Sequence, residues 1–121
     1  MTETKKINFS VDVAISGNSA TYSYKDAAGN PSDGSPTVTT NNTQIIYTLN
    51  TDGLIFLPPT ITGDTGGDLV PTISTDKQTL TIMDTDVTNE SACLILVVAE
   101  TSNPNIPFPS PDPQIVNRPP Q

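Results

Sequence analysis

The sequence contains no histidine, one cysteine and only five basic residues among its 121 positions. Without histidine the chain cannot build a serine–histidine triad or a cysteine–histidine pair, and it lacks the commonest zinc ligand. The single cysteine, Cys93, cannot form an internal disulfide, and its apolar surroundings favour a small buried hydrophobe over a reactive thiol. With these residue types absent, the function classes that remain are carboxylate catalysis, binding, and a purely structural role.

Acidic residues outnumber basic ones by thirteen to five, which gives a formal net charge of −8 at pH 7. Phosphates would be repelled, so we expect no nucleic-acid partner and no anionic membrane partner. The longest apolar run, residues 92–99, is far too short to span a bilayer. Because the N-terminus also shows no signal-peptide pattern, we expect a cytoplasmic protein.

The patterning that is present is that of strands. Apolar residues alternate from Ile7 to Ile15, which predicts a strand with one buried face, and Gly17-Asn18 turns the chain into a hairpin partner at 21–24. Turn residues separate further short apolar runs, which predict strands at 37–40, 44–49, 54–57, 69–74, 79–83 and 92–99. We expect 44–49 and 54–57 to form a hairpin, Pro58-Pro59 to end the second of them, and 92–99 to be the central strand. The predicted fold is all-β, a single antiparallel β-sandwich of about seven to eight strands.

The C-terminal segment has a different texture, because most of the twelve prolines lie between Pro104 and Pro120. Each proline removes a backbone donor, so this segment cannot form an ordinary central strand. We therefore divide the chain into a β-sandwich domain, 1–103, and a proline-rich tail, 104–121. A disordered tail and an extended segment along a sheet edge both fit this composition, and Ile115 and Val116 favour docking.

Asp64-Thr65-Gly66 matches the triplet of pepsin-like and retroviral aspartic peptidases, in which two aspartates share a proton. Those enzymes place two apolar residues before the aspartate, whereas Thr62-Gly63 stand here. A glycine-rich surface loop is the favoured interpretation. A peptidase that acts on other chains through Asp64, as a dimer, is the third-ranked hypothesis.

Asp84 and Asp86, with Asn89 and Glu90, concentrate oxygen ligands in one turn. This turn could hold calcium weakly, yet it lacks the twelve-residue loop pattern with its glycine and bidentate glutamate. A solvated acidic turn is favoured, so we predict no metal and no organic cofactor.

The most specific chemical feature is the dipeptide Asp112-Pro113. An aspartate carboxylate can attack its own backbone carbonyl and form a cyclic anhydride, while the more basic proline nitrogen departs. The effective molarity is high because both groups belong to one residue. Most such bonds are inert at neutral pH, so a second carboxyl group is needed to protonate the leaving nitrogen or activate water.

The opening Asn8-Phe9-Ser10-Val11-Asp12-Val13, the all-β body and the ending Pro111-Asp112-Pro113 resemble the small bacterial DP-EP family, named for Asp-Pro and Glu-Pro dipeptides. The resemblance covers essentially the whole chain and implies a β-sandwich that cleaves itself by aspartic-peptidase chemistry near its C-terminus. Carried over, it implies scission between Asp112 and Pro113 and release of peptide 113–121. No glutamate of this chain precedes a proline, so the second dipeptide of the family name is absent.

The assisting carboxyl group stays open at this point. Glu100 ends the predicted central strand, and a return along the neighbouring edge would bring it toward Asp112; Asp84 and Asp86 are the next choices. Capture of the activated carbonyl by Lys25 or Lys77 would give an amide, but we favour hydrolysis because no lysine follows Glu90.

The first hypothesis is therefore single-turnover self-cleavage at Asp112-Pro113, with the chain's own peptide 113–121 as the partner. The alternative is a non-catalytic binding or assembly module, adhesin-like or phage-associated, and homo-oligomerisation stays open under either hypothesis.

Overall fold

A computed structural model describes residues 5–17, 19–39, 42–64, 66–85, 90–110 and 114–117, with the backbone alone at 90, 114, 116 and 117. Within these ranges the chain forms strands and no helix, which confirms the predicted all-β class. It follows that no helix in the described ranges is long and apolar enough to cross a membrane.

The described residues contain eleven strands rather than the seven or eight expected, because a two-residue strand at 31–32 is not expected from the sequence and the proline-rich segment contributes two more. In chain order the strands are β1 (Lys5–Ser16), β2 (Ser19–Lys25), β3 (Pro31–Ser32), β4 (Thr37–Val38), β5 (Thr43–Leu49), β6 (Leu54–Thr62), β7 (Leu69–Ile73), β8 (Thr79–Asp84), β9 (Glu90–Glu100), β10 (Asn103–Pro109) and β11 (Gln114–Asn117).

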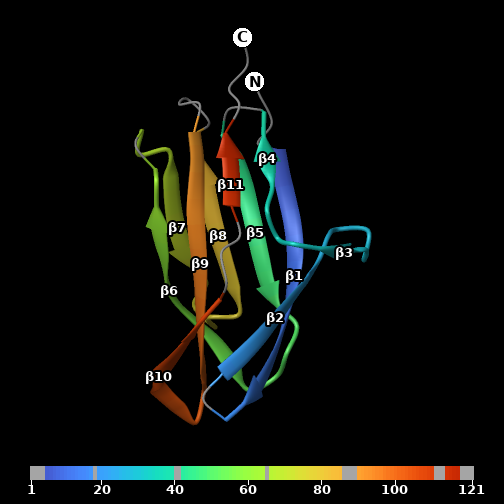
Figure 1. The fold of residues 1–121 in the computed structure, drawn as a ribbon, viewed down its shortest axis with the longest axis vertical. Helices are drawn as coiled ribbons and strands as arrows, with labels where there is room; N and C mark the ends of the chain where they lie inside the picture. Colours follow the sequence, from blue (N-terminus) through green and yellow to red (C-terminus); the bar gives the residue numbers. More distant parts are fainter. Residues whose placement is uncertain are drawn as a thin grey trace.

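The strands form two sheets. The first has six strands in the order β3-β2-β1-β5-β8-β7, and its β1–β5 pair is parallel (Figure 1). The second has five strands, with β10, β9, β11 and β4 in that order and β6 also paired with β9. The predicted hairpin of the first two strands is confirmed, since β1 and β2 pair antiparallel on either side of Gly17.

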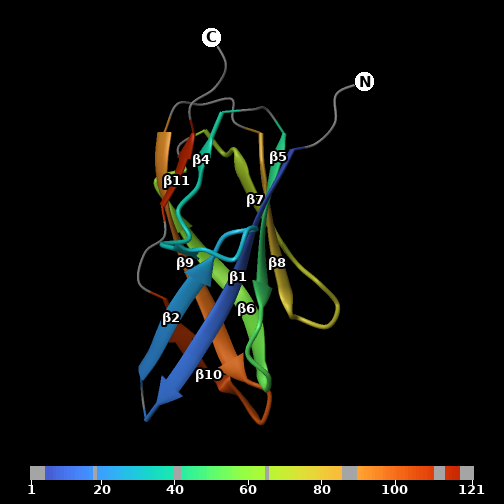
Figure 2. The same cartoon turned by 90° about the vertical axis from the view of Figure 1, so that its right-hand side faces the viewer.

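The expected hairpin between 44–49 and 54–57 is wrong. Strand β5 pairs with β1 and β8 in the first sheet, whereas β6 pairs with β9 in the second, so residues 50–53 carry the chain between sheets (Figure 2). Both strands still contribute buried apolar residues to one core cluster, although they lie in different sheets.

Pro58-Pro59 does not end the strand that contains it, contrary to our expectation. Strand β6 continues to Thr62, with a shift of register against β9 between Leu57 and Thr60. Prolines are tolerated in edge strands and at bulges, and among the described strands of this sheet β6 pairs with β9 alone.

Strand β9 organises the second sheet. Strand β6 pairs with it from Cys93 to Glu100, which occupies one edge, so β10 and β11 must share the other edge. Strand β10 pairs near Val97–Glu100 and β11 pairs with Glu90–Cys93. The proline-rich segment thus runs back along β9 as two strands placed end to end (Figure 1).

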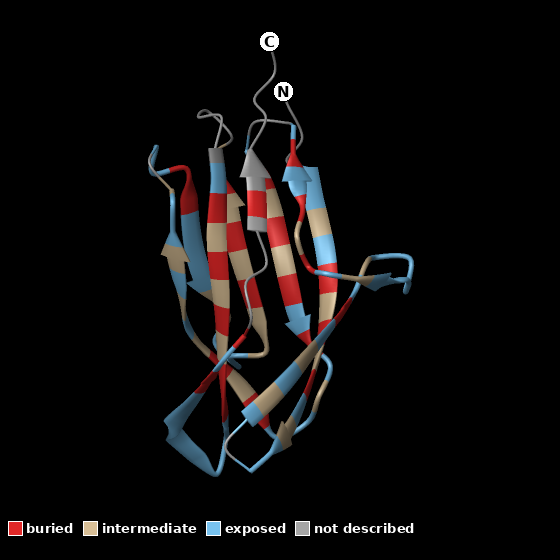
Figure 3. Cartoon of the chain, viewed as in Figure 1, coloured by how far each residue is buried: buried red, intermediate tan, exposed pale blue. Residues whose placement is uncertain are grey.

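The hydrophobic core is a single cluster of buried side chains that come from both sheets. Buried and less buried residues alternate along β1, β5, β8 and β9 (Figure 3), as expected for strands with one face on the core. One cluster joins Val11, Tyr47 and Leu80 of the first sheet to Phe56 and Leu96 of the second. The central run 92–99 is less covered than its sequence suggests, because Cys93, Ile95 and Val97 on one of its faces are only half-buried.

Candidate functional site

The candidate scissile dipeptide, Asp112-Pro113, and the candidate assisting residue Asp86 lie outside the described residues. The structure does fix the chain on both sides of the dipeptide, at Ser110 and at Gln114. We call these two attachments the upstream and downstream anchors. They determine which part of the fold faces the dipeptide.

The upstream anchor is a pair of hydrogen bonds between Ser110 and Leu96. The Ser110 backbone N–H donates to the Leu96 carbonyl oxygen at 2.7 Å, and the Ser110 hydroxyl oxygen accepts from the Leu96 backbone N–H at 2.9 Å. Both residues are buried, Leu96 fully so. Because these bonds are shielded from water, breaking them would leave a buried backbone group unsatisfied.

The downstream anchor is strand β11, in which Gln114 faces Cys93 and Ile115 faces Ala92. Strand β4 pairs with β11 on its other side, in parallel, so β11 lies inside the sheet and not along its edge. The side chain of Ile115 is 0% exposed and belongs to the shared core cluster. A proline-rich segment can supply an inner strand here because the four residues of β11 contain no proline.

The two anchors are out of register by one residue. Between the pairs Pro109–Val97 and Gln114–Cys93, the sequence has four intervening residues (110–113) on the C-terminal side and three (94–96) in β9. One residue is therefore in excess across from β9, as in a β-bulge. Bulges interrupt the regular ladder and are common beside active sites, so this mismatch singles out the stretch that contains the dipeptide.

The opposite edge of β9 carries a similar irregularity. There Leu57 pairs with Val97 and Thr60 with Ile95, so Pro58-Pro59 stand across from the single residue Leu96. Both neighbours of β9 thus depart from regular pairing next to Leu96, the residue that holds Ser110.

Two tyrosines of β2 reach from the first sheet to the upstream anchor. The Tyr22 hydroxyl donates a hydrogen bond to the Phe108 carbonyl oxygen. The Tyr24 hydroxyl is buried and interacts with Ser110, although no hydrogen bond of ordinary geometry joins the two side chains. Burial raises the pKa of Tyr24 to about 12, while the Ser110 hydroxyl opposes that rise. Both burial and the neighbouring Tyr24 raise the pKa of Tyr22, so the two phenols stay protonated at neutral pH.

Sequence reasoning did not single out Ser110, Tyr22 or Tyr24. A signal for the tyrosines does exist, because residues two apart on a strand share one face. Ser110 stands between Pro109 and Pro111, which makes its N–H a rare donor in that stretch. No sequence pattern, however, says that β2 and the segment after β10 meet.

Glu100 is exposed at the end of β9 and faces Asn103 on one edge and Leu54 on the other. It lies four residues beyond Leu96, roughly 13 Å along an extended strand. Strand β10 does make the expected return along β9, but that return leads the chain away from Glu100. The structure therefore does not bring Glu100 to either anchor.

Asp84 is fully buried at the end of β8, where it pairs with Thr43 of β5 and Leu69 of β7. It follows Leu80 and Ile82 on the core face of that strand. Asp84 thus belongs to the first sheet, whereas both anchors belong to the second.

Asp64 has a structural task in the loop between β6 and β7. Its two carboxylate oxygens accept hydrogen bonds from the backbone N–H groups of Asp68 at 2.9 Å and Leu69 at 3.1 Å. A carboxylate used in this way organises a turn, which agrees with the surface-loop interpretation. Within the described ranges, no group of three acidic or cysteine side chains could hold a metal ion.

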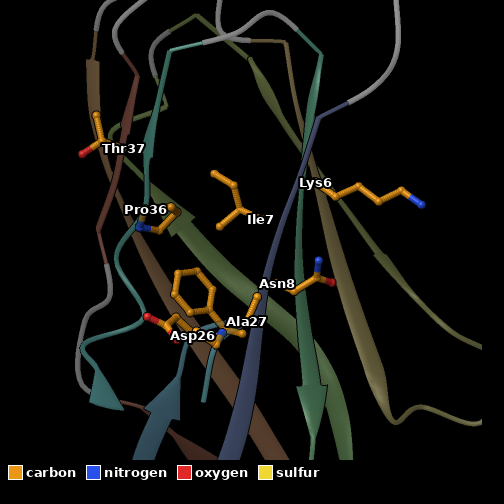
Figure 4. A pocket seen from close by; sticks show the side chains of 9 residues that line it. Lys6, Ile7, Asn8, Asp26, Ala27, Pro36 and Thr37 are labelled. Carbon is orange, nitrogen blue, oxygen red and sulfur yellow. Dashed lines mark hydrogen bonds between the residues drawn. The ribbon is translucent and has the colours of Figure 1, made fainter. Parts of the chain in front are cut away.

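A hollow of about 460 Å³ lies between β1, residues 26–28 and the start of β4 (Figure 4). Ile7 points into it toward Pro36, whereas Lys6 points away. Its carboxylate, Asp26, already accepts hydrogen bonds from the backbone N–H groups of Ala28 and Asn30. Neither Ser110 nor Leu96 lines this hollow, and its lining residue Thr37 is the one that pairs with Val116 of β11.

The comparisons with known proteins give one result on the family. The family model described as the DP-EP family matches residues 5–119, nearly the whole chain. A search of curated proteins finds no match.

Proposed function

The chain belongs to the DP-EP family, and on that premise we propose that it cleaves its own Asp112–Pro113 peptide bond once, by carboxylate chemistry. We also infer that its two sheets pack face to face as a β-sandwich, because residues of both sheets share one core cluster. The partner of the reaction is the chain's own segment 113–121.

The observation that carries this proposal is the one-residue mismatch between the two anchors. Ser110 and Gln114 are both held against β9, and the dipeptide falls within the stretch that has one residue too many. Fixed ends limit the conformations of the segment between them, and a bulge removes a residue from the regular ladder. Both effects favour reaction within a single residue over the inert extended strand.

In the proposed reaction, the Asp112 side-chain carboxylate attacks the Asp112 backbone carbonyl carbon. A carbon–oxygen bond forms, the carbon–nitrogen bond to Pro113 breaks, and the nitrogen departs with a proton from an acid. Water then opens the cyclic anhydride and leaves two carboxyl groups on Asp112. Together the products contain one water more than the intact chain, and neither a metal nor an oxidant takes part.

We propose that the acid that protonates the Pro113 nitrogen is one of three carboxyl groups, those of Glu100, Asp84 and Asp86. The position of Glu100 on the strand does not support it, and Asp84 lies in the other sheet. Ser110 we propose as a positioning residue, because it fixes the chain two residues before Asp112.

Intact mass after incubation near neutral pH tests the proposal. We expect wild type to lose residues 113–121, Asp112→Asn to stay whole, and Asp64→Asn to cut like wild type, because Asp64 only organises its loop. Loss of a general acid or base typically lowers a rate by 10²–10⁴-fold, so among Glu100→Gln, Asp84→Asn and Asp86→Asn the assisting group should stand out. We expect less than a tenfold effect from Glu100→Gln.

Each variant must be checked for folding by circular dichroism, since a misfolded chain would also fail to cut. A wild type that remains whole after long incubation would contradict self-cleavage and favour the non-catalytic binding or assembly module. Scission of the Asp112→Asn chain at the same bond would contradict the role of the Asp112 carboxylate.

A further inference from the structure

Strand β11 follows the proposed cleavage point directly and is built into the sheet along both of its edges. Four residue pairs join it to β9 and two join it to β4. In Figure 1 it lies between these two strands. Cleavage would therefore cut the covalent link to β11 without touching the backbone pairing that holds it.

The side of β11 that faces the core carries Ile115, which is fully buried in the same cluster as Ala92 of β9 and Val38 of β4. This arrangement matches a recurring mode of peptide recognition, in which an extended peptide adds to a sheet. Backbone hydrogen bonds supply affinity there, and pockets for alternate side chains supply specificity.

We propose that self-cleavage converts β11 into a bound peptide, and that the slot between β9 and β4 is a binding site for an extended peptide with a branched aliphatic side chain at the position of Ile115. The peptide runs antiparallel to β9 and parallel to β4, as β11 does. This inference rests on the proposed function, because only a cut chain holds β11 as a separate molecule.

Cleavage would open this site to other peptides because it lowers the effective concentration of β11 at the slot. In the intact chain, only three residues link Ser110 to Gln114, and a link this short gives an effective concentration of about the millimolar range or higher. A peptide in trans cannot compete with that value at ordinary concentrations. After the cut, β11 returns to the slot only at the concentration of free peptide, so another peptide can take its place.

Exchange of a labelled peptide tests the inference. Wild-type protein whose cleavage has been verified by denaturing mass spectrometry is incubated with an excess of fluorescent peptide of sequence 113–121, and native mass spectrometry measures the bound label. We expect the cut chain to keep its own peptide at first and then to take up the labelled one. The same peptide with Ile115→Asp should bind on the order of 10²-fold more weakly, and Ile115→Val should bind nearly as well.

The uncut Asp112→Asn chain is the matched control, and it should take up on the order of 10²-fold less label than the cut chain. A wild type that is never cut overturns both the proposed function and this inference. A cut chain that loses its peptide and binds no label overturns the inference alone. Retention without any exchange, or equal binding of the Ile115→Asp peptide, also overturns it, because β11 is then a permanent part of the fold or the slot does not read the aliphatic side chain.

Discussion

Strands β10 and β11 occupy the same edge of β9, yet the structure holds them by different means. Strand β10 is exposed from Asn103 to Pro107 and buries only Phe108, whereas β11 has a partner on each side and buries Ile115 completely. The upstream segment is held near its end, by the buried Phe108, which accepts a hydrogen bond from Tyr22, and by the hydrogen bonds of Ser110. The two strands of the C-terminal segment therefore differ in packing as well as in composition, since β10 contains three prolines and β11 contains none.

This difference suggests a division of labour around Asp112-Pro113. Upstream, directional hydrogen bonds fix the position of the backbone while contributing little burial. Downstream, burial of Ile115 and pairing on both sides hold β11 in the sheet. Under the proposed function, the upstream anchor would fix the position of the dipeptide before the cut, and the downstream anchor would hold the segment after it.

The largest expected effect is a loss of stability when the buried Ile115 of β11 is truncated, compared with truncation of the exposed Ile106 of β10. In the uncut Asp112→Asn background, Ile115→Ala should lower the free energy of unfolding by about 2–5 kcal/mol, because a fully buried side chain leaves a cavity. Ile106→Ala in β10 is the matched control; Ile106 is 49% exposed and should cost less than about 0.5 kcal/mol. Urea unfolding measures the free energy of unfolding of both variants. Equal losses of stability would contradict the proposed difference in packing between the two strands.

Alkaline pH should lower the free energy of unfolding through the buried tyrosines, one of which, Tyr24, lies beside the upstream anchor. The pKa of Tyr24 is raised from 10.0 to about 12 by burial, so folding favours the protonated phenol. Its contribution to stability is fully present below pH 10 and is lost as the pH rises through about 12. A shift of that size corresponds to about 3 kcal/mol at most. Unfolding free energies between pH 9 and pH 12 should fall, and should fall less steeply in Tyr24→Phe.

Tyr22 and Tyr47 add to the same trend, because burial raises the pKa of both. A stability that stays constant from pH 9 to pH 12 would contradict the buried placement of these phenols.

The smallest expected effect is at the upstream anchor itself. Ser110→Ala removes the acceptor of the buried Leu96 N–H and should cost about 1–3 kcal/mol in the uncut background, while Ser110→Thr should recover part of the loss. Ser102→Ala, at an exposed position, serves as the control. In the chain that retains Asp112, Ser110→Ala should also slow cleavage at neutral pH. A variant that loses stability but cuts at the wild-type rate would show that Ser110 does not position the dipeptide.

Much of the fold could be predicted from alternation alone, because Ile7–Ile15 and Thr79–Met83 each bury every second residue against one core. Pairing across long distances could not. The turn 50–53 looks like a hairpin by local chemistry, and only the arrangement of two sheets explains why it joins β5 to a different sheet. Pro58-Pro59 led to a second wrong prediction, that the strand ends there. They lie inside β6, an edge strand that tolerates prolines.

The candidate site shows the same limit. Asp112-Pro113 is visible in the sequence as a chemical possibility, and Ile115 as an apolar residue among prolines. The one-residue mismatch beside Leu96 is invisible there, because it depends on which residues of β9 face Pro109 and Gln114. The separation of Glu100 from the anchors likewise follows from register, which spacing in the sequence does not determine.

The pairing of Thr37 with Val116 also has a consequence for the order of events during synthesis. Strand β4 is two residues long, and β11 is its partner in the second sheet, so this sheet cannot be completed until the ribosome has released residue 117. Contacts between segments so distant in sequence form late in folding. If the chain cleaves itself as proposed and needs both anchors to do so, scission can follow only after the second sheet is complete, and a cut chain would then mark a molecule that has finished folding.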